Sequence, residues 1–446
     1  MALIQIKMYP KYGRVTKKLN DRERDRMTSK RAIVLMGMVW ACVAMANAEN
    51  WPGFRGPGRQ GVSTETKVPT SWSTTDNIAW KTPIDGQSWS SPIVWGDRVF
   101  VTTATEEGQS FRLLCLDRKT GAIVWNNEIL RQKTNFKSEL NTYATATPVT
   151  DGIAVFVLAA DGTFAAISFE GKVLWKYREF EYYSQHGLGT SPILYNNLVI
   201  AAFDYSSTGP DKLVGWQKPW DQSFILAVDK NSGQVRWKGK RGLSRIAHVV
   251  PNIAKVGDSD QLISGAGDVI QGFDLKTGEL IWTASSAGEG VVPSIVVGDG
   301  LVYSCSGFGD SAIRAVRPDG KGDVTETKIV WETMDDVPHV PTPLYAKPNL
   351  YTLTETGVLR CLDGATGKEV WRQRLGGKFS ASPVWADGKL YLLSESGKTF
   401  VAECGAQYKL IAQNELGEKC CASPAISQGN IFIRSEKTLF CVGPKP

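Results

Sequence analysis

The sequence predicts an all-β fold: an eight-bladed β-propeller with four-stranded blades, closed by an N-terminal strand. Three observations predict it. A phrase reading Asp-x-x-Thr/Ser-Gly-x-x-x-Trp recurs at residues 117–125, 229–237, 274–282 and 363–371. A proline that enters an apolar run recurs eight times, at intervals of 40 to 59 residues. Each interval holds several short apolar runs separated by polar turns, as at residues 342–372. One small sheet cannot bury both faces, so repeats of this length stack radially.

The tryptophan phrase has a local structural meaning. Its Asp can accept hydrogen bonds from backbone amides two residues on, and its Gly supplies the positive φ of a hairpin turn. The tryptophan then lies on the outer strand, where its ring packs on the next blade and its N–H can reach a carbonyl. Stacking on sugars is the alternative role. We expect inter-blade packing for Trp80, Trp125, Trp175, Trp237, Trp282, Trp331 and Trp371.

The second phrase marks where each blade begins. Its proline is usually preceded by a small or β-branched residue. These prolines are Pro92, Pro148, Pro192, Pro251, Pro293, Pro343, Pro383 and Pro424.

Residues 1–48 read as a leader and signal peptide. Residues 32–46 are apolar, follow Lys30-Arg31 and end in Ala46-Asn47-Ala48, a small-x-small cleavage pattern. This stretch is too short to span a bilayer comfortably. Translation from Met1 or from Met27 stays open, and a lipoprotein anchored at Cys42 is a weaker alternative. We therefore expect an exported protein, periplasmic or secreted, with no transmembrane span after cleavage.

The domain boundaries follow from composition. Residues 49–76, rich in Gly, Pro, Ser and Thr, predict an irregular segment on the propeller, and residues 77–446 predict the propeller itself. The last repeat supplies three strands and stops, whereas residues 77–82 look like an orphan outer strand carrying Trp80. Trp80 is thus expected to complete the final blade, which removes exposed sheet edges. The chain is expected to act as a monomer.

Charge gives no support to nucleic-acid binding. Ten of the 51 Lys/Arg and three of the 45 Asp/Glu lie in residues 1–48, which leaves 41 basic against 42 acidic residues. Seven cysteines remain after cleavage, an odd number. Cys115, Cys361 and Cys441 occupy one strand position in three repeats, which favours small buried residues. The pair Cys420-Cys421 is either two unrelated thiols in a loop or a strained vicinal disulfide.

The candidate binding surface comes from the loops. All three histidines precede a repeat proline, in loops joining one blade to the next, and up-and-down connectivity places these loops on one face, here called the histidine face. The long insertion at residues 204–222 joins a second to a third strand and belongs on the same face. The candidate ligand or partner residues are Trp89, Tyr143, His186, Trp216, Arg245, His248, Glu289, His339 and Phe379.

Catalytic and metal motifs are not apparent in the sequence. We find no acid–base pair, nucleophile elbow, phosphate loop or metal-ligand cluster, and the Gly-rich segments lie in hairpin contexts rather than before helices. No catalytic residue and no metal ligand is assigned.

The repeated phrase resembles the pyrroloquinoline quinone (PQQ)-like repeat family, over essentially all of the mature chain. Residues 51–57 (Trp-Pro-Gly-Phe-Arg-Gly-Pro), 89–92, 315–323 and 380–383 are similar to exported bacterial PQQ-binding-like propellers. That family divides between quinoprotein dehydrogenases and non-enzymatic scaffolds, such as the outer-membrane assembly lipoprotein of the BAM complex.

The dehydrogenases would imply PQQ, a calcium held by a carboxylate and an amide, a catalytic Asp and a vicinal disulfide. Cys420-Cys421 is the only match, and it lies in the last blade rather than early in the ring. We therefore expect a non-enzymatic scaffold that binds a cell-envelope protein, peptide or glycan on the histidine face, with no cofactor. A PQQ-dependent oxidoreductase with calcium is the alternative.

Overall fold

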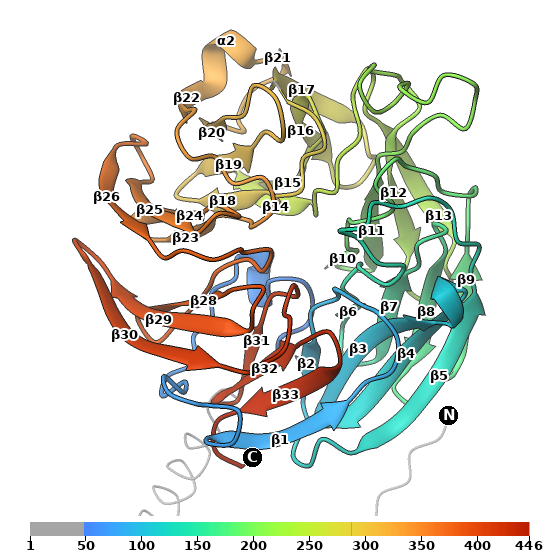
Figure 1. Ribbon diagram of the computed structural model, residues 1–446. Helices are drawn as coiled ribbons and strands as arrows, with labels where there is room; N and C mark the ends of the chain where they lie inside the picture. The colour runs from blue at the N-terminus through green and yellow to red at the C-terminus, as the bar shows by residue number, and fades with distance from the viewer. Residues whose placement is uncertain (1–48, 287, 446) are drawn as a thin grey trace, which may run out of the picture. The chain divides into compact units, whose positions relative to one another are not determined.

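A computed structural model describes residues 49–286 and 288–445, and the predicted leader and signal peptide lie outside these residues. The described chain forms eight sheets arranged around a ring, each with four antiparallel strands that make one blade (Figure 1). Seven blades are built from one stretch of the chain each, and the eighth joins a strand from the N-terminal side to three from the C-terminal side. The predicted all-β, eight-bladed propeller is confirmed. Within these residues no helix has the length and apolarity needed to cross a membrane.

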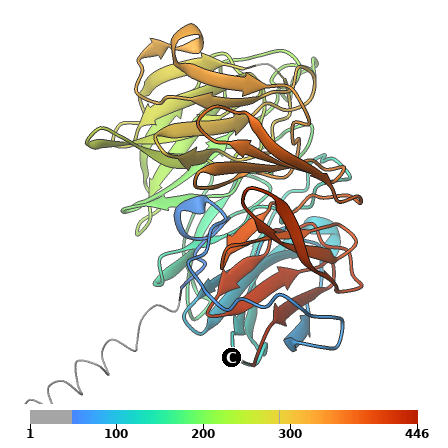
Figure 2. The same ribbon diagram turned by 90° about the vertical axis from the view of Figure 1, so that its left-hand side faces the viewer.

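Each blade runs from an inner strand at the channel to an outer strand at the rim (Figures 1 and 2). The inner strands, in blade order, are β2 (Ile93–Trp95), β6 (Val149–Thr150), β10 (Ile193–Tyr195), β14 (Asn252–Val256), β18 (Val296–Gly298), β23 (Leu344–Ala346), β27 (Val384–Ala386) and β31 (Ala425–Ser427). The second strands are β3 (Arg98–Thr105), β7 (Ala154–Leu158), β11 (Leu198–Phe203), β15 (Ser259–Gly265), β19 (Leu301–Cys305), β24 (Asn349–Leu353), β28 (Lys389–Leu393) and β32 (Asn430–Arg434).

The outer half of each blade is built in the same way. The third strands are β4 (Ser110–Asp117), β8 (Phe164–Ser168), β12 (Phe224–Asp229), β16 (Val269–Asp274), β20 (Ile313–Val316), β25 (Val358–Asp363), β29 (Lys398–Cys404) and β33 (Thr438–Val442). The outer strands are β5 (Ile123–Arg131), β9 (Val173–Tyr177), β13 (Val235–Lys240), β17 (Leu280–Ser285), β22 (Ile329–Thr333), β26 (Glu369–Arg374), β30 (Tyr408–Glu415) and, for blade 8, β1 (Ile78–Pro83).

Few elements fall outside this pattern. In blade 5 the turn before the outer strand is replaced by a short strand, β21 (Gly322–Asp323), which pairs in parallel with β17 of blade 4, and by one helical turn, α2 (Thr325–Lys328). The 3₁₀ turns η1 (Pro57–Arg59) and η2 (Glu106–Gly108) complete the regular structure of the described residues.

The ring closes as the sequence predicts. Strand β1 pairs antiparallel with β33, and Trp80 lies opposite Cys441. The Trp80 side chain is 8% exposed, its ring centre lies 6.0 Å from that of Phe432, and its Nε1 donates to the carbonyl of Arg118 at 2.8 Å. N-terminal and C-terminal residues thus share one sheet, so blade 8 is held together by non-covalent contacts.

Six of the seven repeat tryptophans connect their blade to the next one by a hydrogen bond. Six indole N–H groups donate to a carbonyl in or beside the following hairpin turn, at 2.8–3.1 Å: Trp80 to Arg118, Trp125 to Phe169, Trp175 to Lys230, Trp237 to Leu275, Trp331 to Gly364 and Trp371 to Gly405. The indole ring often packs directly on the backbone of the turn glycine. A Cβ added at Gly121 would come within 2.5 Å of the Trp80 ring. A glycine is therefore required there by close approach as well as by its φ of 72°.

Trp282 is the exception, for a local reason. Blade 5 replaces the hairpin turn with β21 and α2, and the Trp282 N–H donates instead to the Gln261 side chain within its own blade, at 2.9 Å.

Three cysteines of the third strands lie opposite these tryptophans. Cys115, Cys361 and Cys441 pair in register with Trp125, Trp371 and Trp80. In blades 2 to 5 the same position is taken by Ala166, Ala227, Gly272 and Ala315. A small residue leaves room for the indole, and the seven described cysteines are all free thiols in this structure, including Cys420 and Cys421.

The N-terminal segment, residues 49–65, crosses the channel at the end opposite the histidine face. Its η1 turn lies near the middle of the ring in Figure 1 and at one face in Figure 2. Contacts reach all eight blades: Trp51 with Val94, Pro52 with Thr150, Phe54 with the cluster around Ile193, Arg59 with Asn252, Gln60 with Val297, Arg55 with Pro343 and Pro383, and Glu49 with Ser427. The segment therefore forms a floor under the channel.

Candidate functional site

The loops of the histidine face surround one cavity of about 880 Å³ at the channel mouth, which we call the cup. Its lining includes Trp89, His186, Trp216, His248, Glu289 and His339, and Phe54 of the N-terminal segment contributes to its floor. Small-molecule pockets have volumes of roughly 300–1,000 Å³, and the cup lies near the upper end of this range. Its shape therefore suits a ligand or a projecting group better than a flat protein surface.

Three of the nine candidate residues lie outside the cup. Phe379 is completely buried against Phe400, whereas its neighbours Lys378 and Ser380 line the cup. The chain is extended here, and successive side chains point to opposite sides. The expectation that Phe379 lies at the channel mouth is therefore corrected. Arg245 lies behind the lining, where its guanidinium contacts Asp268 and the Gly288 carbonyl.

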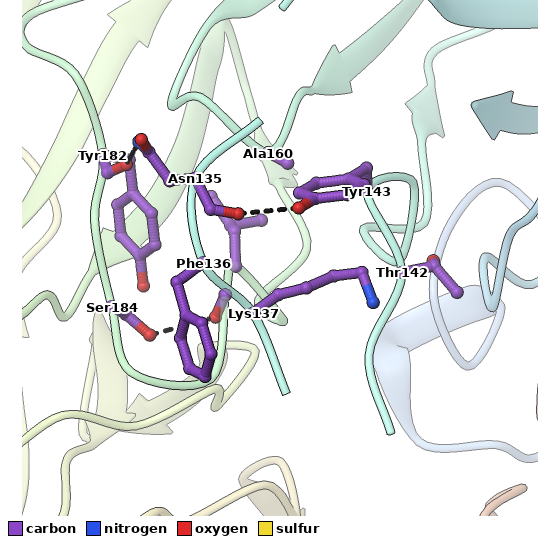
Figure 3. Close-up of a pocket in the computed structure, with 10 residues that line it drawn as sticks. Asn135, Phe136, Lys137, Thr142, Tyr143, Ala160, Tyr182 and Ser184 are labelled. Carbon is purple, nitrogen blue, oxygen red and sulfur yellow. Dashed lines mark hydrogen bonds between the residues drawn. The ribbon is translucent and has the colours of Figure 1, made fainter. Parts of the chain in front are cut away.

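Tyr143 lies in a separate small cavity rather than in the cup. Its hydroxyl donates to the Asn135 carbonyl at 2.7 Å, and Lys137 extends over its ring (Figure 3). This cavity, between the loops that follow blades 1 and 2, has a volume of about 10 Å³, which is close to that of a single water site. It is too small for any other ligand.

His186, Trp216 and His248 form one wall of the cup. The His186 ring is perpendicular to Trp216, with 5.6 Å between ring centres, and lies 5.9 Å from His248. Burial lowers the pKa of His186, and burial together with His186 lowers the pKa of His248 to about 3. Trp216 is held in place because Ile246 donates its N–H to the Gly215 carbonyl at 2.7 Å. This wall is therefore uncharged near neutral pH.

His339 takes part in an acid–base contact that the sequence did not reveal. Its Nδ1 lies 3.0 Å from Oε1 of Glu355, and its Nε2 lies 3.1 Å from Oγ of Ser311. The Ser311 hydroxyl is also in short contact with the Gly307 carbonyl. The conclusion that the chain has no acid–base pair is corrected here, because residues 16 positions apart meet only when the blade folds.

A recurring turn could have identified Glu355. The sequences Thr354-Glu-Thr-Gly and Ser394-Glu-Ser-Gly lie between second and third strands of adjacent blades, and both glutamates line the cup. The Ser435-Glu-Lys turn of blade 8 follows the same pattern. Second-to-third-strand loops open on the histidine face, which directs Glu355 and Glu395 toward the cup, whereas Glu436 of blade 8 is not part of the lining.

The opposite wall carries lysines and Cys421. Nζ of Lys419 lies 5.2 Å from the centre of the Trp89 ring, a cation–π contact. Ser380 donates to Glu395 at 2.6 Å. Burial, followed by the nearby Glu395, raises the pKa of Cys421 to about 12, so this thiol is protonated at neutral pH.

We predict that replacing His248 by Gln reduces the acid sensitivity of the fold. Below pH 6.5 the unfolded chain takes up a proton at this histidine that the folded protein does not bind until about pH 3. Stability from His248 is thus lost as the pH falls, by about 2 kcal/mol between pH 7.5 and 5. Urea unfolding of wild type and His248→Gln across this range should show the difference; parallel curves would contradict it.

Comparison with known proteins gives a family and several structural relatives. The family model described as outer membrane protein assembly factor BamB matches residues 52–128, 73–254 and 265–414. Tetrathionate hydrolase of Acidithiobacillus ferrooxidans (strain ATCC 23270 / DSM 14882 / CIP 104768 / NCIMB 8455) is 25% identical over 191 residues. That match spans 38% of this chain and only 37% of the hydrolase.

Solved structures share the fold at low sequence identity. A europium-containing methanol dehydrogenase aligns with a TM-score of 0.64 and 11% identity, over 87% of this chain and 90% of its own. BamB from Moraxella catarrhalis aligns with a TM-score of 0.55 and 13% identity, over 82% of this chain and 96% of its own. The quinohemoprotein alcohol dehydrogenase from Comamonas testosteroni aligns with a TM-score of 0.63 and 11% identity, over 90% of this chain and 82% of its own. Because the family model matches more than half of the residues, the chain belongs to the BamB family of PQQ-repeat β-propellers.

Proposed function

We propose that this chain is an exported, non-enzymatic binding propeller, periplasmic or secreted, which holds a cell-envelope partner through the cup. The observation that carries the proposal is the convergence of Trp89, Trp216 and three histidines from separate loops on one cavity with a floor. Such loops on a rigid scaffold are typical binding sites. The partner is a protein, a peptide or a glycan that inserts a projecting group.

The chemistry of the cup lining supports a scaffold over a quinoprotein centre. Within residues 49–286 and 288–445, no three His, Cys, Asp or Glu side chains form a group that could hold a metal ion. Three of the four cup glutamates are already engaged: Glu355 by His339, Glu395 by Ser380 and Glu289 by Arg245. The lining carries four carboxylates against two lysines, Lys378 and Lys419, which disfavours an anionic quinone.

The proposal predicts that envelope binding depends on the cup. Purified protein without residues 1–48 is incubated with a cell-envelope fraction, and bound protein is quantified after sedimentation. We expect Trp216→Ala to lower retention about tenfold or more, as loss of a central aromatic contact does. Equal retention of wild type and Trp216→Ala would contradict the proposal, as would stoichiometric uptake of PQQ with calcium, monitored by its ultraviolet–visible spectrum.

Trp95→Ala is the matched control for that experiment. Trp95 is also half-buried, but it is the last residue of inner strand β2, at the face opposite the cup, where its ring packs on Gly152. Its loss should leave retention unchanged. Circular dichroism of both variants checks that the propeller is intact.

A further inference from the structure

The wall of the cup carries a belt of hydroxyl groups. Each blade contributes the residue that enters its inner strand, and in seven of eight blades this residue is Ser or Thr, whereas blade 4 has Val250. All of them line the cup. The seven hydroxyl residues are Ser91, Thr147, Ser191, Ser294, Thr342, Ser382 and Ser423.

Backbone bonds between blades hold the belt together. In six of the eight members, the backbone N–H donates to the hydroxyl oxygen of the next blade's member, at 2.9–3.1 Å. These bonds run from Ser91 to Thr147, Thr147 to Ser191, Val250 to Ser294, Ser294 to Thr342, Thr342 to Ser382 and Ser382 to Ser423. The hydroxyls therefore act as acceptors here, and among the described residues none of these six donates its hydrogen to a protein atom. A ring of O–H donors is left to the cavity.

Two further polar atoms of the cup lack a partner. Oγ of Ser91 and Nδ1 of His248 are buried and make no hydrogen bond within the described residues. Both side chains are less than 10% exposed. Buried polar atoms normally have partners, so these two atoms are available for a hydrogen bond to water or to a ligand. The depth of the cup is thus uncharged, rich in hydrogen-bonding atoms and incompletely satisfied.

The charges of the lining restrict the ligand. The excess of carboxylates over lysines disfavours an anion. Glu289 is compensated only by Arg245, whose Nη1 lies 4.0 Å from its Oε2, and Glu139 has no lysine partner among the lining residues of the cup. Carboxylates accept hydrogen bonds from hydroxyl groups. Trp89, Trp216 and Phe308 add aromatic surface to the lining, and the Phe308 side chain is half exposed. Aromatic rings can pack on the apolar faces of sugar rings.

We propose that the ligand of the cup is the end of a neutral carbohydrate chain. Its sugar rings pack on Trp89 and Trp216, its hydroxyls donate to Glu139 and Glu289, and its innermost oxygens accept from the hydroxyl belt. This inference rests on the proposed function and names the class of its ligand. A cationic peptide would also satisfy the carboxylates, and its carbonyls can accept from the belt, so it is the competing occupant that the hexalysine probe below tests.

Ser91→Ala tests the belt without breaking it. The Ser91 hydroxyl accepts no backbone bond, so its removal costs the fold little, whereas the ligand loses one hydrogen bond. Calorimetric titration uses neutral hexasaccharides of β-1,4-glucose, β-1,4-N-acetylglucosamine and α-1,4-glucose as probes. We expect at least one to bind, with affinity about 2- to 10-fold lower for Ser91→Ala and about tenfold or more lower for Trp216→Ala.

Ser223→Ala is the matched control, because Ser223 is also buried with an unpartnered hydroxyl but lies outside the cup. It should bind like wild type, as should Trp95→Ala. Hexagalacturonate and hexalysine serve as anionic and cationic probes. If neither Ser91→Ala nor Trp216→Ala weakens binding, or if only a charged probe binds, the carbohydrate assignment is wrong.

The envelope experiment separates this failure from failure of the proposed function. Periodate cleaves the vicinal diols of sugars, so treating the envelope fraction with periodate should abolish cup-dependent retention, whereas protease treatment should not. Retention that depends on Trp216 but is lost only with protease overturns the carbohydrate inference and leaves the binding propeller in place. Retention that does not depend on Trp216 overturns the proposed function.

Discussion

Replacing Trp80 by Ala should destabilise the protein by about 3–5 kcal/mol, the usual cost of truncating a large buried aromatic side chain. The indole is 8% exposed, packs near Phe432 and donates to the Arg118 carbonyl in blade 1. Its loss leaves a cavity at the junction of blades 8 and 1 and an unpaired carbonyl. Urea unfolding measures the loss, and a change below about 1 kcal/mol would contradict it.

The position of Trp80 in the ring adds a second, local effect. Strand β1 is the only strand of blade 8 that comes from the N-terminal side, so only non-covalent contacts hold it on β33. Trp331→Ala is the matched control, since that indole is 9% exposed and donates to Gly364 of the next blade, but within a blade of consecutive strands. Both variants should lose similar stability. Amide exchange in β1 should accelerate selectively in Trp80→Ala.

The architecture could be predicted because its determinants are local and repeated. A tryptophan, the turn glycine that covers it in the next blade and the small residue opposite it recur at fixed spacing, so each copy supports the others. Trp80 could be assigned to blade 8 from the same phrase, even though its partner strand lies more than 350 residues away. Where the phrase degenerates, as in blade 5, the structure departs from the pattern at Trp282.

The candidate site could be predicted only at the level of loops. Connectivity determines which face a loop occupies, and this brought His186, His248 and His339 to one cavity. It does not determine side-chain direction, so Phe379 was placed at the mouth although it points into the core. Nor does it reveal contacts between loops, and the pairing of His339 with Glu355 was missed. In the sequence, the residues of the hydroxyl belt could be recognised only as small residues next to the repeat prolines.

A buried ion pair lies in blade 3, at the base of the loop that carries Trp216, and its arginine also contacts blade 4. Arg241 donates to both carboxylate oxygens of Asp204, from Nε at 2.5 Å and from Nη2 at 2.9 Å, and both side chains are at most 1% exposed. Nη2 also donates to Ser264 and to the Gly265 carbonyl of blade 4. Asp204 begins the 204–222 loop, so this pair couples inter-blade packing to a wall of the cup.

Breaking this pair on one side should be among the most damaging single changes in the protein. Asp204→Asn leaves the Arg241 guanidinium buried without a counter-charge, which costs about 3–5 kcal/mol. The double variant Asp204→Leu/Arg241→Met removes both charges and should cost much less than the sum of its single changes, because no buried charge is left uncompensated. Urea unfolding of wild type, Asp204→Leu, Arg241→Met and the double variant measures the coupling free energy between the two side chains. Additive losses would mean that the two charges are solvated independently, which their burial opposes. If the pair also fixes the loop, Asp204→Asn should accelerate amide exchange at residues 213–218 more than the double variant does.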